Sequence, residues 1–324
     1  MSRTGVLLLG FGGPESIDDV RPFMCNLMDR EPSEELVERV CRRYLAIGGA
    51  SPLPGIAASI AGGLEERLAA SGHAAMVRVG MRYWQPFIGD ALGDLVAQGC
   101  DRVVTVSLSP FESKAASGAY REAIDAFVAA FSGLEIVEAP LISARAEYVD
   151  FFASSTTAAI TGLEPGDGAV VVFTAHSLPL ADLVDNDPYE VGLRRTAQAV
   201  AEKLGMAQGR SGVGDTMLPG FSAFGAVEPP HAWFLAFQSK GARPGAWLDP
   251  DLESLIDAAA GMEVKSLVVV PIGFMTDHME TLYDLDIVAA DHALAADLEF
   301  VRAAVPNDDG GLLDAMADMI APLI

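Results

Sequence analysis

The chain has 324 residues and is 51% hydrophobic, so it can build a full core of one or two domains and is not an intrinsically disordered protein. Its formal net charge of −24 would repel nucleic-acid phosphates over most of the surface, and we therefore expect no nucleic-acid partner. The three cysteines, Cys25, Cys41 and Cys100, are widely spaced and form no CxxC motif, which argues against a disulfide framework and against a cysteine-held cluster.

The first predicted strand, Val6 to Leu9, begins close to the N-terminus and is followed at once by glycine and proline. This apolar run is too short for the hydrophobic region of a signal peptide or for a membrane span, so we expect a cytoplasmic protein. The loop at 10–15 has Glu15 where the dinucleotide-binding motif GxGxxG requires glycine, and no Lys-Ser or Lys-Thr pair follows it. We therefore predict no nucleotide site in this loop.

Short runs rich in β-branched residues alternate with longer amphipathic segments along the chain. We predict strands at 6–9, 76–81, 102–108, 135–137, 169–174, 233–238 and 266–270. We predict helices at 33–46, 56–70, 87–98, 119–131, 188–204 and 252–260, the first of them capped by Ser33. The segment at 208–230 is rich in Gly, Ser and Pro, and we predict a long loop there. Strands as continuously hydrophobic as 169–173 are typical of a parallel sheet covered by helices on both faces, so the fold class is α/β.

The chain contains a weak internal repeat. Residues 103–111, VVTVSLSPF, resemble residues 266–274, SLVVVPIGF, since each is a buried strand that ends in proline and then reaches a phenylalanine. The repeat favours two similar Rossmann-like α/β domains with an active cleft between them, because open parallel sheets bind ligands at the carboxyl ends of their strands. We predict an N-terminal domain of residues 1–144, joined by the C-terminal helix 311–324, and a C-terminal domain of residues 145–310.

His176 is the first candidate for chemistry. It stands just beyond the predicted strand 169–174, where a doubly wound sheet presents its working side chains. On its own, this position fits a hydrogen-bonded structural histidine equally well. Ser177 beside it is not part of a GxSxG nucleophile elbow, so a hydrolase triad is not indicated.

A second candidate is the acidic segment 277–284, which follows the predicted strand 266–270. If the segment is helical, Glu280 and Asp284 are four residues apart and their carboxylates share one face, an arrangement that a solvated charged surface also tolerates. His278 and Glu280 lack the HExxH spacing of a zinc site built on one helix. Because this segment and His176 both follow buried strands of the same half, we expect them to converge on one pocket.

Four motifs, in order along the chain, resemble the signatures of the ferrochelatase family. They are GFGGPE at 10–15, RYLAIGGASPL at 43–53, TAHSLP at 174–179 and GFMTDHMETLYD at 273–284. The resemblance continues through AFQS at 236–239 and WLDPD at 247–251 to a last helix at 312–320, so it covers essentially the whole chain. Each motif alone would be weak, and their specificity comes from their number and order.

The resemblance implies both the fold and the residues of the site. It implies a chelatase-like pair of domains in which His176 and Glu280 face each other across a porphyrin, from opposite walls of the cleft. Asp284 would continue an acidic path from Glu280, and all three residues would contact the metal ion. The implied substrate-binding residues are Phe11, Arg43, Tyr44, Ser51 and Tyr120. Phe11 stands where some relatives have a tyrosine that reaches the iron, so axial ligation from this position is not expected.

The implied activity is that of a porphyrin metal chelatase, a lyase of haem biosynthesis that inserts Fe²⁺ into a porphyrin and releases two protons. Neutral His176 would accept these protons, since the pKa of an imidazole lies near the working pH. Coproporphyrin III is the favoured substrate, because the loop 11–15 resembles that of soluble bacterial members that use it, and protoporphyrin IX is second. No permanently bound cofactor is expected, since iron is a substrate and no cysteine follows Cys100 to hold the iron–sulfur cluster of some relatives.

The expected partners are porphyrin, ferrous iron and enzymes of the haem pathway. The apolar rim segment 44–60 favours shielding of a porphyrin, with at most transient membrane contact. Two alternatives stay open. A non-catalytic tetrapyrrole or haem carrier would share the cleft but would need no base, and a cobalt or nickel chelatase of the same architecture would act on an earlier tetrapyrrole.

Overall fold

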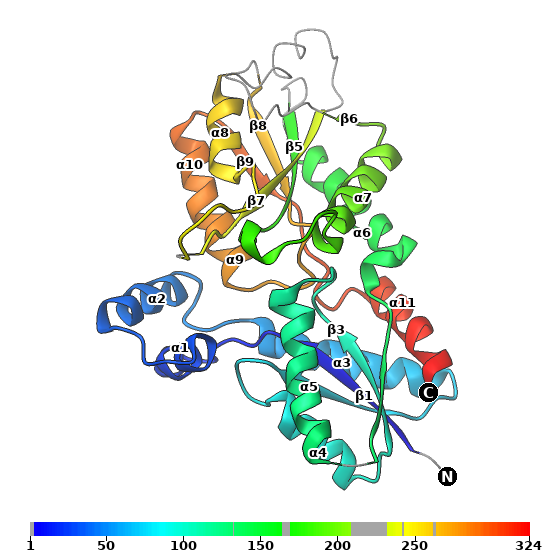
Figure 1. Ribbon diagram of the computed structural model, residues 1–324. Helices are drawn as coiled ribbons and strands as arrows, with labels where there is room; N and C mark the ends of the chain where they lie inside the picture. Colours follow the sequence, from blue (N-terminus) through cyan, green and yellow to red (C-terminus); the bar gives the residue numbers. More distant parts are fainter. Residues whose placement is uncertain (1–2, 132, 164–168, 209–231, 242, 262–263) are drawn as a thin grey trace. The chain divides into compact units, whose positions relative to one another are not determined.

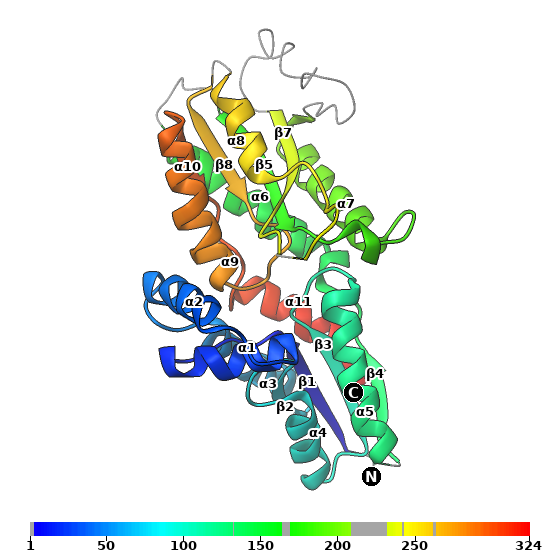
Figure 2. The same cartoon turned by 60° about the vertical axis from the view of Figure 1, so that its left-hand side comes forward.

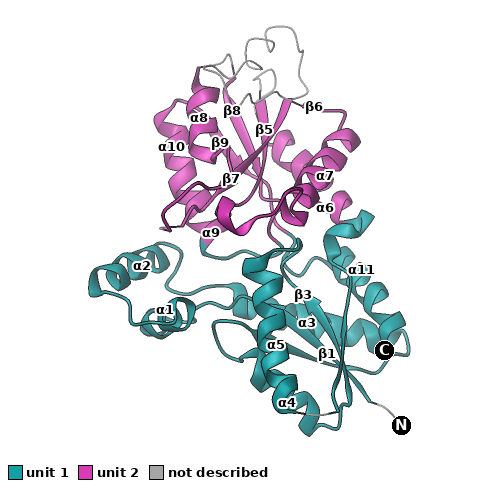
Figure 3. Cartoon of the chain, in the orientation of Figure 1, with its two compact units in different colours: residues 1–147, 275–279, 306–324 teal, residues 148–274, 280–305 magenta. Residues whose placement is uncertain are grey.

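The computed structural model describes residues 3–324 apart from 132, 164–168, 209–231, 242 and 262–263. The chain forms two compact units, coloured separately in Figure 3. Unit 1 comprises Met1–Glu147, Met275–Met279 and Pro306–Ile324, and unit 2 comprises Tyr148–Phe274 and Glu280–Val305. The segments 145–147, 275–279 and 306–310, which were predicted to lie in the second domain, belong to unit 1. The loop predicted at 208–230 lies outside the described residues except for Gln208.

Unit 1 is built on a parallel sheet with the strand order β2-β1-β3-β4. Its strands are β1 (Thr4–Gly10), β2 (Met76–Met81), β3 (Arg102–Ser107) and β4 (Glu135–Glu138). Figures 1 and 2 show α4 (Ile88–Ala97) and α5 (Ala119–Ala130) on one face of the sheet and α3 (Leu53–Ala70) on the other. The C-terminal helix α11 (Gly310–Ile320) packs against α3, where Arg67 forms an ion pair with Asp314. Helices α1 (Val20–Met28) and α2 (Glu34–Ala46) pack against each other around a small core of their own.

Unit 2 is built on a second parallel sheet with the strand order β6-β7-β5-β8-β9. Its strands are β5 (Ala169–His176), β6 (Ala207–Gln208), β7 (Ala232–Gln238), β8 (Ser266–Val270) and β9 (Glu299–Arg302). Helices α8 (Leu252–Ala260) and α10 (Ala290–Ala295) cover one face, and α6 (Ala146–Thr161) and α7 (Pro188–Lys203) cover the other (Figure 1). The short helix α9 (Met279–Leu282) and a π-helical segment, Asp284–Ala289, lead from β8 to α10.

Four strands of each sheet share one topology, and β6 is an additional edge strand of the unit 2 sheet. In unit 1, β1 has β2 on one side and β3 on the other, and β4 lies beyond β3. In unit 2, β5 has β7 on one side and β8 on the other, and β9 lies beyond β8. The internal repeat in the sequence therefore falls on the equivalent strands β3 and β8, and the predicted pair of Rossmann-like α/β domains is confirmed. In unit 2 the carboxyl ends of β5 and β8 flank the point where the chain changes from one side of the central strand to the other. Ligands bind at such switch points in open α/β sheets.

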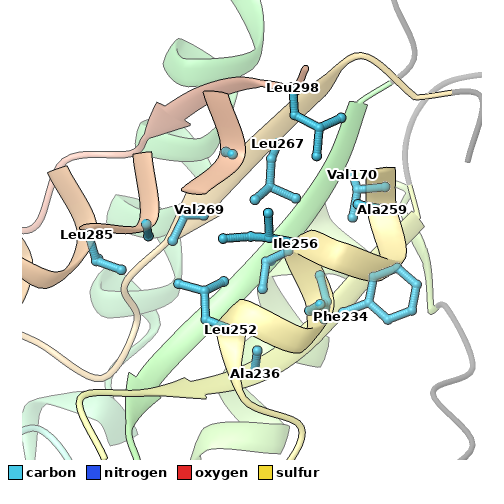
Figure 4. Packing of buried hydrophobic residues seen from close by; sticks show 14 of the residues in the cluster. Val170, Phe234, Ala236, Leu252, Ile256, Ala259, Leu267, Val269, Leu285 and Leu298 are labelled. Carbon is cyan, nitrogen blue, oxygen red and sulfur yellow. The ribbon is translucent and has the colours of Figure 1, made fainter. Parts of the chain in front are cut away.

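The core under α8 also fixes the chain that follows α9. Figure 4 shows Leu252 and Ile256 of α8 packed against Val170 of β5 and Val269 of β8, together with Leu285 of the π-helical segment. Leu285 is fully buried, and burial of a leucine side chain contributes roughly 1.5–3 kcal/mol. This burial anchors the segment that begins at Asp284 to the sheet.

Some differences from the predicted elements lie at element ends. β5 continues to His176, beyond its predicted end, because its pairing with β7 runs from Val171 through His176. α3 begins at Leu53 and not at 56. The proline in its first turn is compatible with this earlier start, because an N–H at that position would have no hydrogen-bond partner within the helix. Ser33 caps α2 as predicted, with its side chain accepting a hydrogen bond from the N–H of Leu36.

The sequence patterns did not predict α1, α6, α10, β6 or β9. β9 is a short, partly exposed edge strand without the continuous hydrophobic run that marks β5 and β8. Among the described residues, no helix combines the length and the apolar character needed to cross a membrane.

Candidate active site

His176 is the last residue of β5 and pairs in register with Gln238, the last residue of β7. Its side chain is 32% exposed. The hydroxyl of Tyr189, in the first turn of α7, donates a hydrogen bond of 2.8 Å to the main-chain carbonyl of His176. Tyr189 is buried, and burial together with the charge of Glu280 raises the pKa of its hydroxyl, which therefore stays protonated as a donor.

Glu280 lies in α9, and its Oε2 is 3.0 Å from Nδ1 of His176. Both residues belong to unit 2. The prediction that the two side chains face each other from opposite walls of a cleft is therefore wrong, because they form one hydrogen-bonded pair on one unit. The reason is topological: β5 and β8 are adjacent parallel strands, so the chain segments at their carboxyl ends lie at the same edge of the sheet.

The pairing changes the acidity of His176. Burial disfavours the charged imidazole and lowers its pKa, but the charge of Glu280, its hydrogen bond and the charge of Asp284 outweigh burial. The pKa of His176 is therefore raised above the ordinary value of 6.5. A raised pKa makes the neutral imidazole a stronger proton acceptor than a free histidine. Nδ1 is engaged by Glu280, and within the described part of the chain Nε2 of His176 has no hydrogen-bond partner.

The sequence predicted that Glu280 and Asp284 share one face of a single helix. In the structure, Asp284 lies outside the helix of Glu280. α9 ends at Leu282, and Asp284 opens the π-helical segment. The hydroxyl of Ser239, directly after β7, donates a hydrogen bond of 2.6 Å to Oδ2 of Asp284. The two carboxylates are thus held by the ends of different strands, Glu280 by β5 and Asp284 by the residue after β7.

Metal contact from these residues stays a prediction. In the described ranges no group of three His, Cys, Asp or Glu side chains is placed to hold a metal ion. His176, Glu280 and Asp284 nevertheless lie on one edge of one sheet, which agrees with the expectation that the two motifs meet. Imidazole nitrogen and carboxylate oxygen are both ligands that Fe²⁺ accepts.

Three of the predicted substrate-binding residues lie around the loop after β1 in unit 1. Phe11 is 37% exposed, and its ring centroid lies 4.7 Å from that of Tyr83. Tyr44 is buried in the core that joins α1 and α2. The N–H of Ser51 donates a hydrogen bond of 2.7 Å to the carbonyl of Pro14. The motifs at 10–15 and 43–53 therefore meet in the folded unit.

The remaining two predicted residues differ in accessibility. Tyr120, in the first turn of α5, is buried, with its hydroxyl 3.2 Å from that of Ser109, and burial raises its pKa to about 12. Arg43 lies in the last turn of α2 and is partly exposed. Contact of a porphyrin with any of the five residues stays a prediction.

The site residues predicted from the sequence do not include Arg82, Gln238 or Ser239. Arg82 follows β2, its Nε donates to the carbonyl of Ala119 at 3.1 Å, and its guanidinium lies 4.9 Å from the ring centroid of Tyr83. Gln238 and Ser239 stand at the end of β7 and contact the segment of Glu280 and Asp284. All three stand at the carboxyl end of a parallel strand, the same signal that pointed to His176, and could have been found by it.

Comparisons with known proteins agree along nearly the whole chain. A family model described as Ferrochelatase matches residues 3–323. A ferrochelatase from Herpetosiphon aurantiacus is 29% identical over 324 residues, which cover 98% of this chain and 98% of the relative. A ferrochelatase from Gloeobacter violaceus is 31% identical over 342 residues, with 99% and 97% covered. A coproporphyrin III ferrochelatase from Streptomyces griseus subsp. griseus is 32% identical over 324 residues, with 97% and 84% covered.

Two solved structures share the fold. SirB from Bacillus subtilis with Fe³⁺ is similar with a TM-score of 0.54 at 12% identity, covering 98% of this chain and 94% of that one. CbiX, described as the terminal enzyme of sirohaem biosynthesis in denitrifying bacteria, gives 0.53 at 15% identity, with 99% of both chains covered. At such identities the likeness supports the two-domain fold alone. The family model, however, spans almost every residue, and the chain belongs to the ferrochelatase family, whose members are porphyrin metal chelatases.

Proposed function

We propose that this protein inserts Fe²⁺ into a porphyrin and releases two protons, with coproporphyrin III as the favoured substrate and protoporphyrin IX as the second. The observation that carries the proposal is the His176–Glu280 pair at the carboxyl edge of the unit 2 sheet, with Nδ1 and Oε2 3.0 Å apart. Membership of the ferrochelatase family supports the reaction class.

His176 is the proposed proton acceptor. Metal insertion replaces two pyrrole N–H protons, so the site needs a base that can be used twice. With Nδ1–H donated to Glu280, the ring presents the lone pair of Nε2 to the substrate. As Nε2 takes the first pyrrole proton, the ring becomes an imidazolium that Glu280 stabilises through Nδ1–H, and release of the Nε2 proton to solvent restores the Nε2 lone pair. The imidazole is then neutral again for the second pyrrole proton.

Glu280 and Asp284 are the proposed contacts for the incoming ion, which is a substrate. Their charges attract Fe²⁺, and their oxygens can replace water molecules around it. Each carboxylate already accepts a hydrogen bond within the protein, Glu280 from His176 and Asp284 from Ser239. These bonds compete with coordination and keep the hold weak, as transfer to a porphyrin requires.

The preference for coproporphyrin III has two supports. A relative named as a coproporphyrin III ferrochelatase is 32% identical over 97% of this chain. Coproporphyrin carries four propionates and needs cations to receive them. Arg43 is a partly exposed cation in unit 1, and Arg82 forms no ion pair within the described part of the chain.

The proposal needs no permanently bound cofactor. Iron is consumed as a substrate, and the chain has only Cys25, Cys41 and Cys100, one fewer than a four-cysteine cluster requires.

The test is porphyrin metallation by the purified protein under anaerobic conditions. Fe²⁺ or Zn²⁺ is mixed with coproporphyrin III or with protoporphyrin IX, and loss of free-porphyrin fluorescence is followed through several turnovers. We expect multiple turnovers, with a higher kcat/KM for coproporphyrin III. Tight binding of porphyrin without turnover would instead identify a carrier, and insertion of only Co²⁺ or Ni²⁺ into an earlier tetrapyrrole would identify a different chelatase.

A further inference from the structure

The dipeptide Gln238-Ser239 connects the strand of His176 with the acidic segment that carries Glu280 and Asp284. Gln238 ends β7 in register with His176. Its main-chain carbonyl accepts a hydrogen bond of 2.8 Å from the N–H of Ser177, the residue after His176. The backbone of this dipeptide is therefore fixed relative to β5, the strand that ends in His176.

The side chain of Gln238 reaches the acidic segment. Its Nε2 donates a hydrogen bond of 2.9 Å to the main-chain carbonyl of Glu280. The residue is only 6% exposed, and among the described residues its Oε1 has no hydrogen-bond partner. A buried amide with an unpaired oxygen is costly, whereas an apolar side chain of the same size would avoid that cost. The bond to Glu280 is thus the contribution that distinguishes glutamine here.

Ser239 occupies a backbone conformation that is unusual for serine. Its φ is +59°, in the left-handed region, which costs free energy for residues other than glycine. Across the described ranges, the other non-glycine residues with positive φ are all Asn or Asp, the types that tolerate this region best: Asp29, Asn186, Asp297 and Asn307. Serine is therefore the exception, and glycine would be the unstrained choice.

The hydroxyl gives the reason for a serine at this position. It donates a hydrogen bond of 2.6 Å to Oδ2 of Asp284, and such a bond to a charged acceptor is among the strong ones. The helix α9 ends before Asp284, so the helix of Glu280 does not orient the second carboxylate. Ser239, directly after β7, helps to orient it.

We infer that Gln238 and Ser239 are positioning residues, Gln238 for Glu280 and Ser239 for the carboxylate of Asp284 as it receives the incoming metal ion. The inference rests on the proposed function, because it assigns these residues to metal delivery in that reaction. It goes beyond a general stabilising role, since Ser239 retains strain that glycine would remove.

The test compares Ser239→Gly and Ser239→Ala with wild type in the metallation assay with Zn²⁺. Glycine removes both the strain and the hydroxyl, so we expect a midpoint of denaturant unfolding equal to or above that of wild type. We expect the KM for Zn²⁺ to rise about tenfold in both variants, the effect of losing one hydrogen bond to a charged group. The porphyrin Kd, measured by fluorescence, should stay near that of wild type.

Asp297→Gly is the matched control for relief of strain. Asp297 has a φ of +58°, lies between α10 and β9 in the same unit, and is exposed. As for Ser239→Gly, we expect a midpoint of denaturant unfolding equal to or above that of wild type, but with no change in the KM for Zn²⁺. Gln238→Met, which conserves volume but removes the donor, should lower kcat about tenfold, because it releases the backbone of Glu280.

A double-mutant cycle decides whether Ser239 acts through Asp284. If it does, Ser239→Gly should add almost nothing to the defect of Asp284→Asn. An unchanged KM for Zn²⁺ in Ser239→Gly, or full additivity in the cycle, would overturn the inference for Ser239, and a normal kcat in Gln238→Met would overturn it for Gln238. Absence of turnover in wild type would instead refute the proposed function itself.

Discussion

Nδ1 of His176 lies 3.0 Å from Oε2 of Glu280, although 104 residues separate the two in the sequence. The bond joins the end of β5 to the short helix after β8, and it orients the imidazole with Nε2 away from the carboxylate. It also raises the pKa of His176 against the opposing effect of burial. The pair therefore combines a base with the group that sets its strength and its tautomer.

His176→Ala should abolish metal insertion. Removal of the base is expected to lower kcat by about 100-fold or more, while the porphyrin Kd changes little because the proton acceptor is not a major binding surface. Metallation kinetics and porphyrin fluorescence measure the two effects separately. His292→Ala is a suitable control, since His292 pairs with Asp257 on the surface of the same unit. Near-normal turnover in His176→Ala would remove His176 from the mechanism.

The pH dependence of kcat should follow the protonation of His176. A base must be neutral to accept a proton, so activity should rise as pH increases through the raised pKa of His176, above 6.5. Glu280→Gln removes the main cause of the raised pKa of His176. The pH range over which kcat rises should therefore move to lower pH. A range that stays in place, or moves to higher pH, would show that another group controls the reaction.

Glu280→Gln should also slow insertion more than Asp284→Asn. Glu280 contacts the base directly, whereas Asp284 raises the pKa of His176 less and is held by Ser239. The two variants are compared by kcat at one pH well above the pKa of His176, where the imidazole is neutral in both. The reverse order would contradict the larger role proposed for Glu280, which contacts both the base and the ion.

Gly273→Ala should disturb the site without touching its charged groups. A Cβ at this position would lie 2.5 Å from Cβ of Ala175 and 2.8 Å from its Cα, so the end of β5 would have to move. We expect the free energy of unfolding to fall by about 2 kcal/mol and kcat to fall with it, because Ala175 precedes His176. Gly261→Ala, whose nearest neighbour would be a carbonyl oxygen at 3.5 Å, is the control and should fold normally. A Gly273→Ala variant with normal stability and kcat would contradict this packing argument.

Arg43→Ala should reveal the porphyrin preference. If Arg43 receives a propionate, its loss should weaken coproporphyrin III binding about tenfold and protoporphyrin IX binding less, since the latter has fewer carboxylates. Arg42→Ala is the matched control, because Arg42 is exposed one position along α2 and lies 4.0 Å from Glu38. Equal effects of the two substitutions on both porphyrins would argue against a specific role for Arg43.

The burial pattern of the strands could be predicted because it is local. Continuous hydrophobic runs at 169–174 and 266–270 indicate strands covered on both faces, and they correspond to β5 and β8. The edge strand β9 was not predicted. It is less buried than a central strand, so its sequence lacks a continuous hydrophobic run. The same locality explains why His176 was singled out from its place after a buried run.

The sequence by itself determined the fold class, the repeat of two α/β domains and the family, because each depends on patterns within short segments and on their order. Only the tertiary structure decided that His176 and Glu280 form a hydrogen bond and do not face each other across a cleft. It also decided that Ser239 donates a hydrogen bond to Asp284. Those contacts depend on which strands become neighbours in the sheet. Strand order is set by long-range pairing, and residue spacing along the chain does not encode it.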